Sequence, residues 1–181
     1  MNVQESPLKD CFVIKPKIFH DGRGFFYESY NEQKFAEETG LVVDFVQDNE
    51  SFSTKGVLRG LHFQKGSFAQ SKLVRVVFGE VLDVAVDLRK DSATYGKHFS
   101  ILLSSENKKQ LFVPRGFAHG FVVLSDTALF SYKCDNYYNK ESESGLLYND
   151  PSLNIDWQLK DKELIISDKD LVLPTLENIS L

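Results

Sequence analysis

Apolar and polar positions alternate with a period of two over most of the chain. In residues 81–88 this alternation places Leu82, Val84, Val86 and Leu88 on one face and Val81, Asp83, Ala85 and Asp87 on the other. Similar short runs occupy residues 41–47, 57–64, 73–78, 99–103, 110–113, 120–124 and 128–132. Turn signals separate them at 55–56, 79, 91–96 and 114–116. Many short strands with tight turns predict a mainly β fold, either a sandwich or a small barrel.

Helical signals are few. Asn31 is a suitable N-cap for a helix over residues 31–39, Glu32 suits its positive end, and Gly40 is placed to end it in a left-handed conformation. The segment from residue 149 onward is more polar, contains the single Trp157, and is expected to hold one or two short helices packed on the barrel. With no internal repeat or linker, residues 1–181 are predicted to form one domain.

Composition narrows the class of protein. The net charge of −5 argues against general nucleic-acid binding, which needs surplus Lys and Arg, although a local basic site for a small anion stays open. Cys11 and Cys134 are far apart and have neither metal nor redox spacing, so inert core thiols are expected. Residues 1–10 lack an apolar run typical of a signal peptide, and no stretch is apolar enough to span a bilayer. A cytoplasmic protein without membrane contact is expected.

The segment from residue 47 to residue 72 has an unusual mixture of polar and apolar side chains. A solvated sheet face explains alternation in general, but burying unpaired charge is costly, so this segment also favours a site. Arg59 and His62 are three residues apart and would point to opposite faces of a regular strand, whereas a bulge at Gly60 would bring both to one face. The candidate polar residues are Gln47, Asn49, Arg59, His62, Gln64 and Lys72.

Three further motifs are less specific. In residues 114–120 (PRGFAHG), the glycines around His119 suggest a close approach of the backbone, whereas a lone histidine would favour a turn followed by a strand with a hydrogen-bonded core histidine. Tyr132 and Tyr138 are, taken alone, typical of packing. In residues 21–28 (DGRGFFYE), the Asp-Gly pair indicates a turn, and Arg23 either clamps a phosphate or is an ordinary surface residue.

The histidine spacing argues against a metal centre. His20, His62, His98 and His119 form neither a His-x-His nor a His-x-x-x-His pair, and no cysteine lies near them in sequence. Metal-binding barrels of the cupin type generally carry a His-x-His motif, but the residue two after His62 is Gln64. A metal site built from distant residues stays open as the less favoured alternative.

Taken together, these segments resemble the dTDP-4-dehydrorhamnose 3,5-epimerases, a metal-free branch of the cupins. The resemblance extends in order from about residue 15 to residue 170 and is weakest after Trp157. It implies a cupin-type jelly-roll barrel with a few short peripheral helices, which acts as a homodimer on a dTDP-4-keto-6-deoxy sugar without a metal or other cofactor. The matching segments are 21–28, 47–49, 56–64 (GVLRGLHFQ), 79–89 (GEVLDVAVDLR), 114–121, 132–133 and 149–150.

The resemblance also implies roles for individual residues. His62 is the base, Tyr132 the acid on the opposite face of the sugar, and Asp170 the carboxylate paired with the base. Lys72 is suited to stabilise negative charge on the C4 oxygen, because both inverted carbons lie next to that ketone. The implied substrate-binding residues are Arg23, Arg59 and His119 at the diphosphate or sugar, Glu28, Gln47, Asn49 and Tyr138 at the nucleotide, and Glu143 and Lys169 as further contacts.

Two rival functions stay open from the sequence. One is an epimerase that inverts only C3 or only C5 of a related nucleotide-linked 4-keto sugar, since such enzymes share the same His, Tyr and Lys. The other is a cupin of a different class, either a binding module without catalysis or a metal-dependent enzyme.

Overall fold

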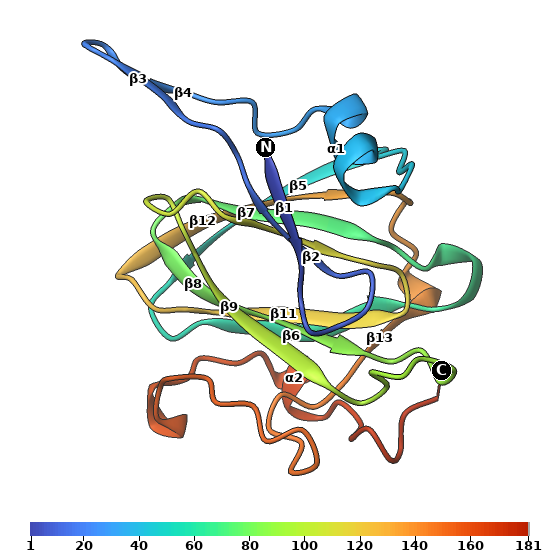
Figure 1. Ribbon diagram of the computed structural model, residues 1–181. Coiled ribbons are helices and arrows are strands. Elements are labelled where there is room, and N and C mark those ends of the chain that lie inside the picture. Colours follow the sequence, from blue (N-terminus) through green and yellow to red (C-terminus); the bar gives the residue numbers. More distant parts are fainter. Residues whose placement is uncertain (181) are drawn as a thin grey trace.

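The fold, described for residues 1–180 of a computed structural model, consists of two antiparallel sheets that face each other (Figure 1). The six-stranded sheet has the order β1 (Asn2–Glu5), β2 (Phe12–Lys15), β10 (Gln110–Val113), β7 (Lys72–Phe78), β12 (Thr127–Cys134), β5 (Gln47–Thr54). The five-stranded sheet has the order β13 (Glu143–Gly145), β6 (Leu58–Gln64), β11 (Phe117–Val123), β8 (Glu80–Asp87), β9 (His98–Ser104). This architecture confirms the predicted mainly β fold of the cupin jelly-roll type.

The main hydrophobic core lies between the two sheets. It is built from the inward-facing side chains of both, such as Val74 and Phe130 from the six-stranded sheet and Val81 and Phe121 from the five-stranded one. The rings of Phe121 and Phe130 stack at a centroid distance of 4.1 Å and so join the sheets. Strand β8 is buried on both faces, because its other face is covered by the C-terminal part of the chain.

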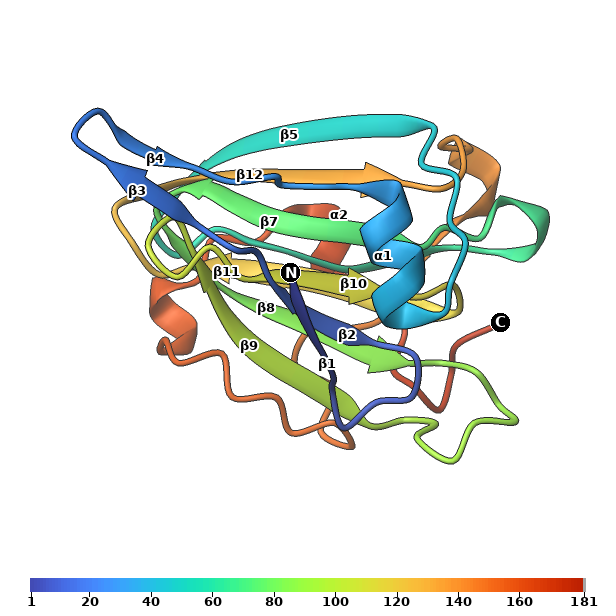
Figure 2. The same ribbon diagram turned by 45° about the horizontal axis from the view of Figure 1, so that its top comes forward.

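Two further layers cover the outer faces of the sheets (Figures 1 and 2). Helix α1 (Glu32–Thr39) lies on the six-stranded sheet, where its Phe35 packs on Phe112 at a centroid distance of 5.2 Å. The orange-to-red segment after β13 covers the five-stranded sheet with a second apolar cluster that includes Trp157. That segment holds helix α2 (Asp168–Leu171) and a short 3-10 helix (Asp161–Glu163), as expected for the region after residue 149.

The predicted helix is confirmed in detail. The side chain of Asn31 accepts a hydrogen bond from the backbone N–H of Lys34, so it caps the first turn of α1. Gly40 ends the helix with a φ of +74°, and its N–H donates to the carbonyl oxygen of Ala36. The remaining 3-10 turns are Gly66–Phe68 and Lys140–Ser142.

The predicted strand over residues 41–47 is wrong. Residues 41–46 are irregular, and β5 begins only at Gln47. The alternation is real, because Leu41, Val43 and Phe45 pack against the α1 cluster whereas Val42 is exposed. Within the described residues the segment forms no ladder before Gln47, although the N–H of Val46 donates to the carbonyl oxygen of Cys134 at the end of β12. Alternation indicates that the two sides of an extended chain have different surroundings. It does not by itself indicate that the chain is hydrogen-bonded to a neighbouring strand. The short strands β1, β2 and β13 were not predicted, nor was β5 beyond its first residue.

A two-stranded hairpin of β3 (Phe19–Asp21) and β4 (Gly24–Phe26) projects from the body of the molecule (Figure 1). The Asp-Gly turn predicted at its tip is confirmed, with Gly22 and Arg23 forming the turn. Its phenylalanines are largely exposed, at 52% for Phe19, 54% for Phe25 and 66% for Phe26. We call this hairpin the arm.

Candidate active site

A cavity of about 510 Å³ opens between the two sheets, a size typical of small-molecule sites. Both sheets and helix α2 supply its polar lining. Seven of the residues assigned by resemblance line this cavity: Arg59 and His62 on β6, Lys72 on β7, His119 on β11, Tyr132 on β12, and Lys169 and Asp170 on α2.

The bulge predicted at Gly60 is confirmed and explains how Arg59 and His62 share the cavity. His62 is paired with His119 and Arg59 with Phe121, so three steps along β6 match two along β11. Gly60 has a φ of +132°, which side chains rarely adopt, and a Cβ atom there would lie 2.6 Å from the Cα of Gly120. The glycine next to His119 therefore makes the close backbone approach that its motif suggested.

His62 is held by a carboxylate from the C-terminal segment. Its Nε2 lies 2.7 Å from Oδ1 of Asp170, whose side chain is 5% exposed while that of His62 is 30% exposed. Ser167 caps α2 by accepting a hydrogen bond from the N–H of Asp170. Burial acts to raise the pKa of Asp170, but the hydrogen bond and charge of His62 and the N–H of Gly60 hold that pKa below its usual value. An ionised Asp170 places the proton of His62 on Nε2 and leaves Nδ1 free to act as a base.

Tyr132 and Lys72 lie on the other side of the cavity, on the six-stranded sheet. Burial raises the pKa of Tyr132, so its hydroxyl keeps its proton at neutral pH. Burial also lowers the pKa of Lys72, although the nearby charge of Asp83 acts in the opposite direction. The ammonium of Lys72 lies 5.9 Å from the centre of the Tyr132 ring. A proton donor and a cation thus face His62 from the opposite sheet.

His119 forms a second histidine–carboxylate pair. Its Nε2 lies 3.0 Å from each carboxylate oxygen of Asp83, and both side chains are buried. Both readings of the 114–120 motif therefore apply, because this hydrogen-bonded histidine also lines the cavity.

A smaller cavity of about 180 Å³ adjoins the first and shares His62, Lys72 and Tyr132 with it. Glu143 at its edge accepts hydrogen bonds from the hydroxyl of Tyr138 at 2.9 Å and from the ammonium of Lys169 at 2.5 Å. Tyr138 is 54% exposed, which makes packing a poor explanation for this aromatic ring. The other predicted substrate-binding residues that line this cavity are Gln47 and Asn49.

Arg23 and Glu28 are not brought to these cavities within one chain. Arg23 is at the tip of the arm, 91% exposed in its side chain, and pairs with Asp21. Glu28 pairs with Lys34 of α1. Neither of them lines the cavity that contains His62.

Several lining residues were not predicted from the sequence. Ser51 follows Gln47 and Asn49 on the inward face of β5, and this period-two pattern of polar residues was a usable signal. Asp83 does not line the cavity itself but contacts His119, which does; the sequence placed it on one face of its strand, and an aspartate between apolar residues was not pursued. The segment before α2 gave no usable pattern, yet it contributes Ile165, Ile166 and Ser167.

Three remaining features of the described chain concern metal-binding groups, cysteines and membrane-spanning helices. Within residues 1–180, no group of three or more His, Cys, Asp or Glu side chains is arranged to hold a metal ion. Cys11 and Cys134 are both buried, as expected, and burial raises the pKa of Cys11 to about 12. No helix in the same part of the chain is long and apolar enough to cross a membrane.

Comparison with known proteins identifies the family. The family model described as dTDP-4-dehydrorhamnose 3,5-epimerase matches residues 5–178. The dTDP-4-dehydrorhamnose 3,5-epimerase of Shigella flexneri is 55% identical over 171 residues, which are 94% of this chain and 93% of that relative.

Solved structures agree with this match. A dTDP-6-deoxy-D-glucose-3,5-epimerase from Legionella pneumophila, in complex with dTDP-4-keto-L-rhamnose, is 49% identical with a TM-score of 0.94, covering 99% of this chain and 94% of that one. ChmJ, a 3′-monoepimerase from Streptomyces bikiniensis in complex with dTDP-quinovose, is 30% identical with a TM-score of 0.89, covering 98% and 88%. The chain belongs to the dTDP-4-dehydrorhamnose 3,5-epimerase family and is an isomerase.

Proposed function

We propose that this enzyme inverts C3 and C5 of dTDP-4-dehydro-6-deoxy-D-glucose to give dTDP-4-dehydro-L-rhamnose. The single observation that carries the proposal is the placement of His62 and Tyr132. They lie on opposite sheets and line one cavity, with His62 backed by the buried Asp170. Inversion at carbon removes a proton from one face and returns one to the other, and this geometry supplies a base and an acid on the two sides.

The reaction is divided between three side chains. The free Nδ1 of His62 takes the proton from the carbon next to the C4 ketone, and the electron pair of that C–H bond moves to the C4 oxygen as an enolate. The ammonium of Lys72 stabilises the negative oxygen. Tyr132 then donates its hydroxyl proton to the other face of the same carbon while the ketone forms again. Exchange with water removes the proton from His62 and returns one to Tyr132 before the second inversion.

This chemistry requires no cofactor, because the ketone itself makes both neighbouring carbons acidic. Asp170 acts through His62: it orients the ring and stabilises the imidazolium that forms when the proton is taken. The raised pKa of Tyr132 suits a group that must hold its proton until it donates it.

Charge and cavity shape support a nucleotide-linked sugar as substrate. Arg59, Lys72 and Lys169 line the larger cavity and favour an anionic ligand despite the negative net charge of the chain. Arg59 is steadied by a hydrogen bond from its Nε to the hydroxyl of Ser53 at 3.1 Å. We place the sugar between His62 and Tyr132, and the nucleotide towards the smaller cavity, where the exposed ring of Tyr138 is available for stacking on the base.

We propose a homodimer in which the arm reaches the partner subunit. The exposed phenylalanines of the arm and the exposed Phe52 and Phe78 on the outer face of the six-stranded sheet are apolar surface suited to association. Arg23 lies at the tip of this arm, away from the cavity of its own chain. The diphosphate contact expected of Arg23 would then be made in the site of the second copy.

The decisive experiment is the reaction in D₂O with the 4-keto-6-deoxyglucose nucleotide, followed by NMR of the product. We expect deuterium at both C3 and C5 and the L-rhamno configuration. The alternative is inversion of one carbon only, and its basis is the similarity of this chain to the 3′-monoepimerase. Label at one carbon without double inversion would refute the 3,5-epimerase proposal in favour of that alternative.

A further inference from the structure

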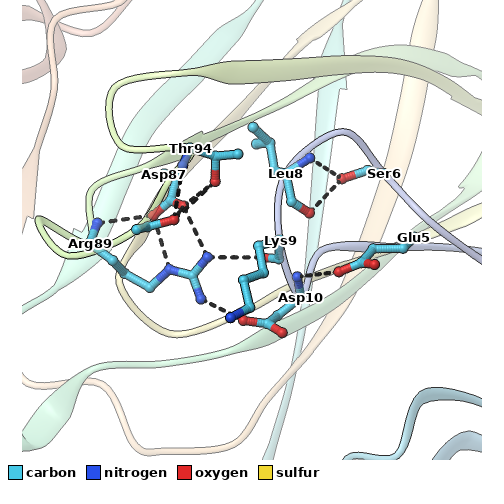
Figure 3. Close-up of polar contacts among 9 residues, drawn as sticks. Glu5, Ser6, Leu8, Lys9, Asp10, Asp87, Arg89 and Thr94 are labelled. Carbon is cyan, nitrogen blue, oxygen red and sulfur yellow. Dashed lines mark hydrogen bonds and ion pairs between the residues drawn. The ribbon is translucent and has the colours of Figure 1, made fainter.

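Strand β8 carries two fully buried carboxylates, Asp83 and Asp87, on the face that points into the barrel. They differ in their partners. Asp87 accepts two hydrogen bonds to Oδ1 from Arg89 and three to Oδ2 from Arg89, Ser92 and Thr94, at 2.6–3.0 Å (Figure 3). This network satisfies the charge of Asp87 completely at the end of the barrel next to the β1–β2 turn. Asp87 therefore has no capacity left for another partner.

Asp83 has a single side-chain partner. Within residues 1–180, the side chain of Asp83 makes hydrogen bonds only to Nε2 of His119, and both carboxylate oxygens lie 3.0 Å from that nitrogen. A buried carboxylate without a donor is costly, so the arrangement requires a proton on Nε2. Asp83 thereby fixes both the orientation of the ring and the nitrogen that carries its proton.

His119 lines the cavity, and Asp83 engages only one of its two ring nitrogens. Nδ1 has no hydrogen-bond partner within the described chain. It is not fully buried either, because the fully buried side-chain atoms without a partner are the hydroxyls of Ser51 and Ser71. The ring packs against Phe130, with centroids 6.1 Å apart and planes at 26°, so it has little freedom to rotate. With the proton on Nε2, a neutral imidazole offers Nδ1 as a hydrogen-bond acceptor.

We propose that Asp83 is a positioning residue, which holds His119 so that Nδ1 accepts a hydrogen bond from a sugar hydroxyl of the substrate. This inference rests on the proposed function for the identity of the sugar. An unprotonated Nδ1 cannot form a hydrogen bond with the phosphate oxygens of the diphosphate, because both are acceptors. A pyranose hydroxyl can donate to it. His119 is thereby assigned to recognition of the sugar, beside the base His62, its register partner.

The state of His119 is tested directly by ¹⁵N NMR of protein labelled in histidine, at neutral pH. With four histidines in the chain, the His119 signals are assigned from their loss in His119→Gln. We expect a neutral ring with the proton on Nε2 in the wild type. In Asp83→Asn, the carboxamide NH₂ can donate to Nε2, and we expect the proton to move to Nδ1. Asp87→Asn is the matched control, since it removes an equally buried carboxylate on the same strand and should leave the His119 signals unchanged.

The functional consequence is measured with the 4-keto sugar nucleotide. We expect Asp83→Asn to lower kcat/KM about tenfold or more, chiefly through KM, and folded Asp87→Asn to stay within about threefold of the wild type. A wild-type ring protonated on both nitrogens, or on Nδ1 alone, overturns the proposal, as does an unchanged KM in a folded Asp83→Asn. The wild-type spectrum, assigned with His119→Gln, needs no substrate, so its result does not depend on whether the proposed epimerisation holds.

Discussion

His62 and His119 are direct register partners on neighbouring strands, and each has its Nε2 on a buried carboxylate. The two carboxylates come from different places: Asp170 from helix α2 and Asp83 from strand β8. The two rings also differ in exposure, at 30% for the side chain of His62 and 7% for that of His119. We propose that the same pairing serves an accessible base in one case and a fixed recognition group in the other.

Asp170→Asn tests the first of these pairs. The amide cannot stabilise the imidazolium of His62 and offers a donor to Nε2 in place of an acceptor, so kcat should fall by a factor on the order of 10²–10⁴. The measurement is steady-state kinetics, with KM nearly unchanged. Asp168→Asn, an exposed neighbour on the same helix, is the control and should retain full activity. Equal activity in the two variants would show that Asp170 has no role in the mechanism.

Tyr132→Phe separates removal of the proton from its return. Without the hydroxyl, the base can still take a proton and release it to D₂O, but the opposite face has no donor. We expect exchange of label into recovered substrate to persist while inversion falls by about 100-fold or more. Tyr138→Phe serves as the control for loss of a tyrosine hydroxyl elsewhere in the site. Retention of full inversion by Tyr132→Phe would argue against the acid role.

Mixed dimers test whether Arg23 of the arm acts in the site of the partner subunit. His62→Ala and Arg23→Ala chains, each poorly active alone, are combined and allowed to exchange subunits. If Arg23 serves the partner's site, a mixed dimer contains one site with both wild-type residues, and activity should rise to about half of the wild-type value per mixed dimer. If Arg23 acts in its own chain, that site is never assembled. Failure to recover activity, with exchange verified by native mass spectrometry, rejects the trans contact.

Asp87→Asn should lower the free energy of unfolding at pH 7 by about 3 kcal/mol, because it leaves Arg89 without its buried partner. Burial acts to raise the pKa of Asp87, but the hydrogen bonds from Arg89, Ser92 and Thr94 hold it below its usual value. The stabilisation is therefore fully present above the unfolded pKa of about 3.9 and is lost as pH falls through the lower folded pKa. Denaturant titrations should show wild type and variant converging below about pH 4, and a gap independent of pH contradicts this account.

Gly60→Ala should destabilise the fold by more than about 2 kcal/mol, through both the strained φ and the clash with Gly120. Gly22→Ala is the control, since no atom lies within 4 Å of its added Cβ and its φ is not in the left-handed region. We expect the control to stay within about 0.5 kcal/mol of the wild type. Thermal unfolding of the two variants side by side provides the comparison.

Local features of the chain could be predicted from the sequence, whereas long-range partners could not. The bulge at Gly60 followed from two local facts, the three-residue spacing of Arg59 and His62 and the glycine between them. The cap at Asn31 was equally local. By contrast, His62 and Asp170 are 108 residues apart, and no pattern of residues pairs them without the resemblance to a known family.

The errors have physical causes as well. Residues 41–46 alternate because one side packs on α1, and the sequence contains no information on whether a neighbouring strand is present. Asp83 was visible as a polar residue in an apolar strand, but its importance depends on a histidine from another strand. The assignment of Arg23 and Glu28 to the site by resemblance is not among these errors and stays a prediction, although a single chain does not bring them to the cavity.

The contact between Gly60 and Gly120 has a consequence for redesign of the pocket. A side chain at either position would meet backbone atoms of the facing strand at about the same separation, 2.6 Å in each direction. The two positions therefore behave as one unit, and a library that varies them independently will be dominated by inactive members. Changes of substrate range are better sought at Ser51, Ile165 and Ile166, where the cavity wall can be reshaped without moving the strands that carry the two histidines.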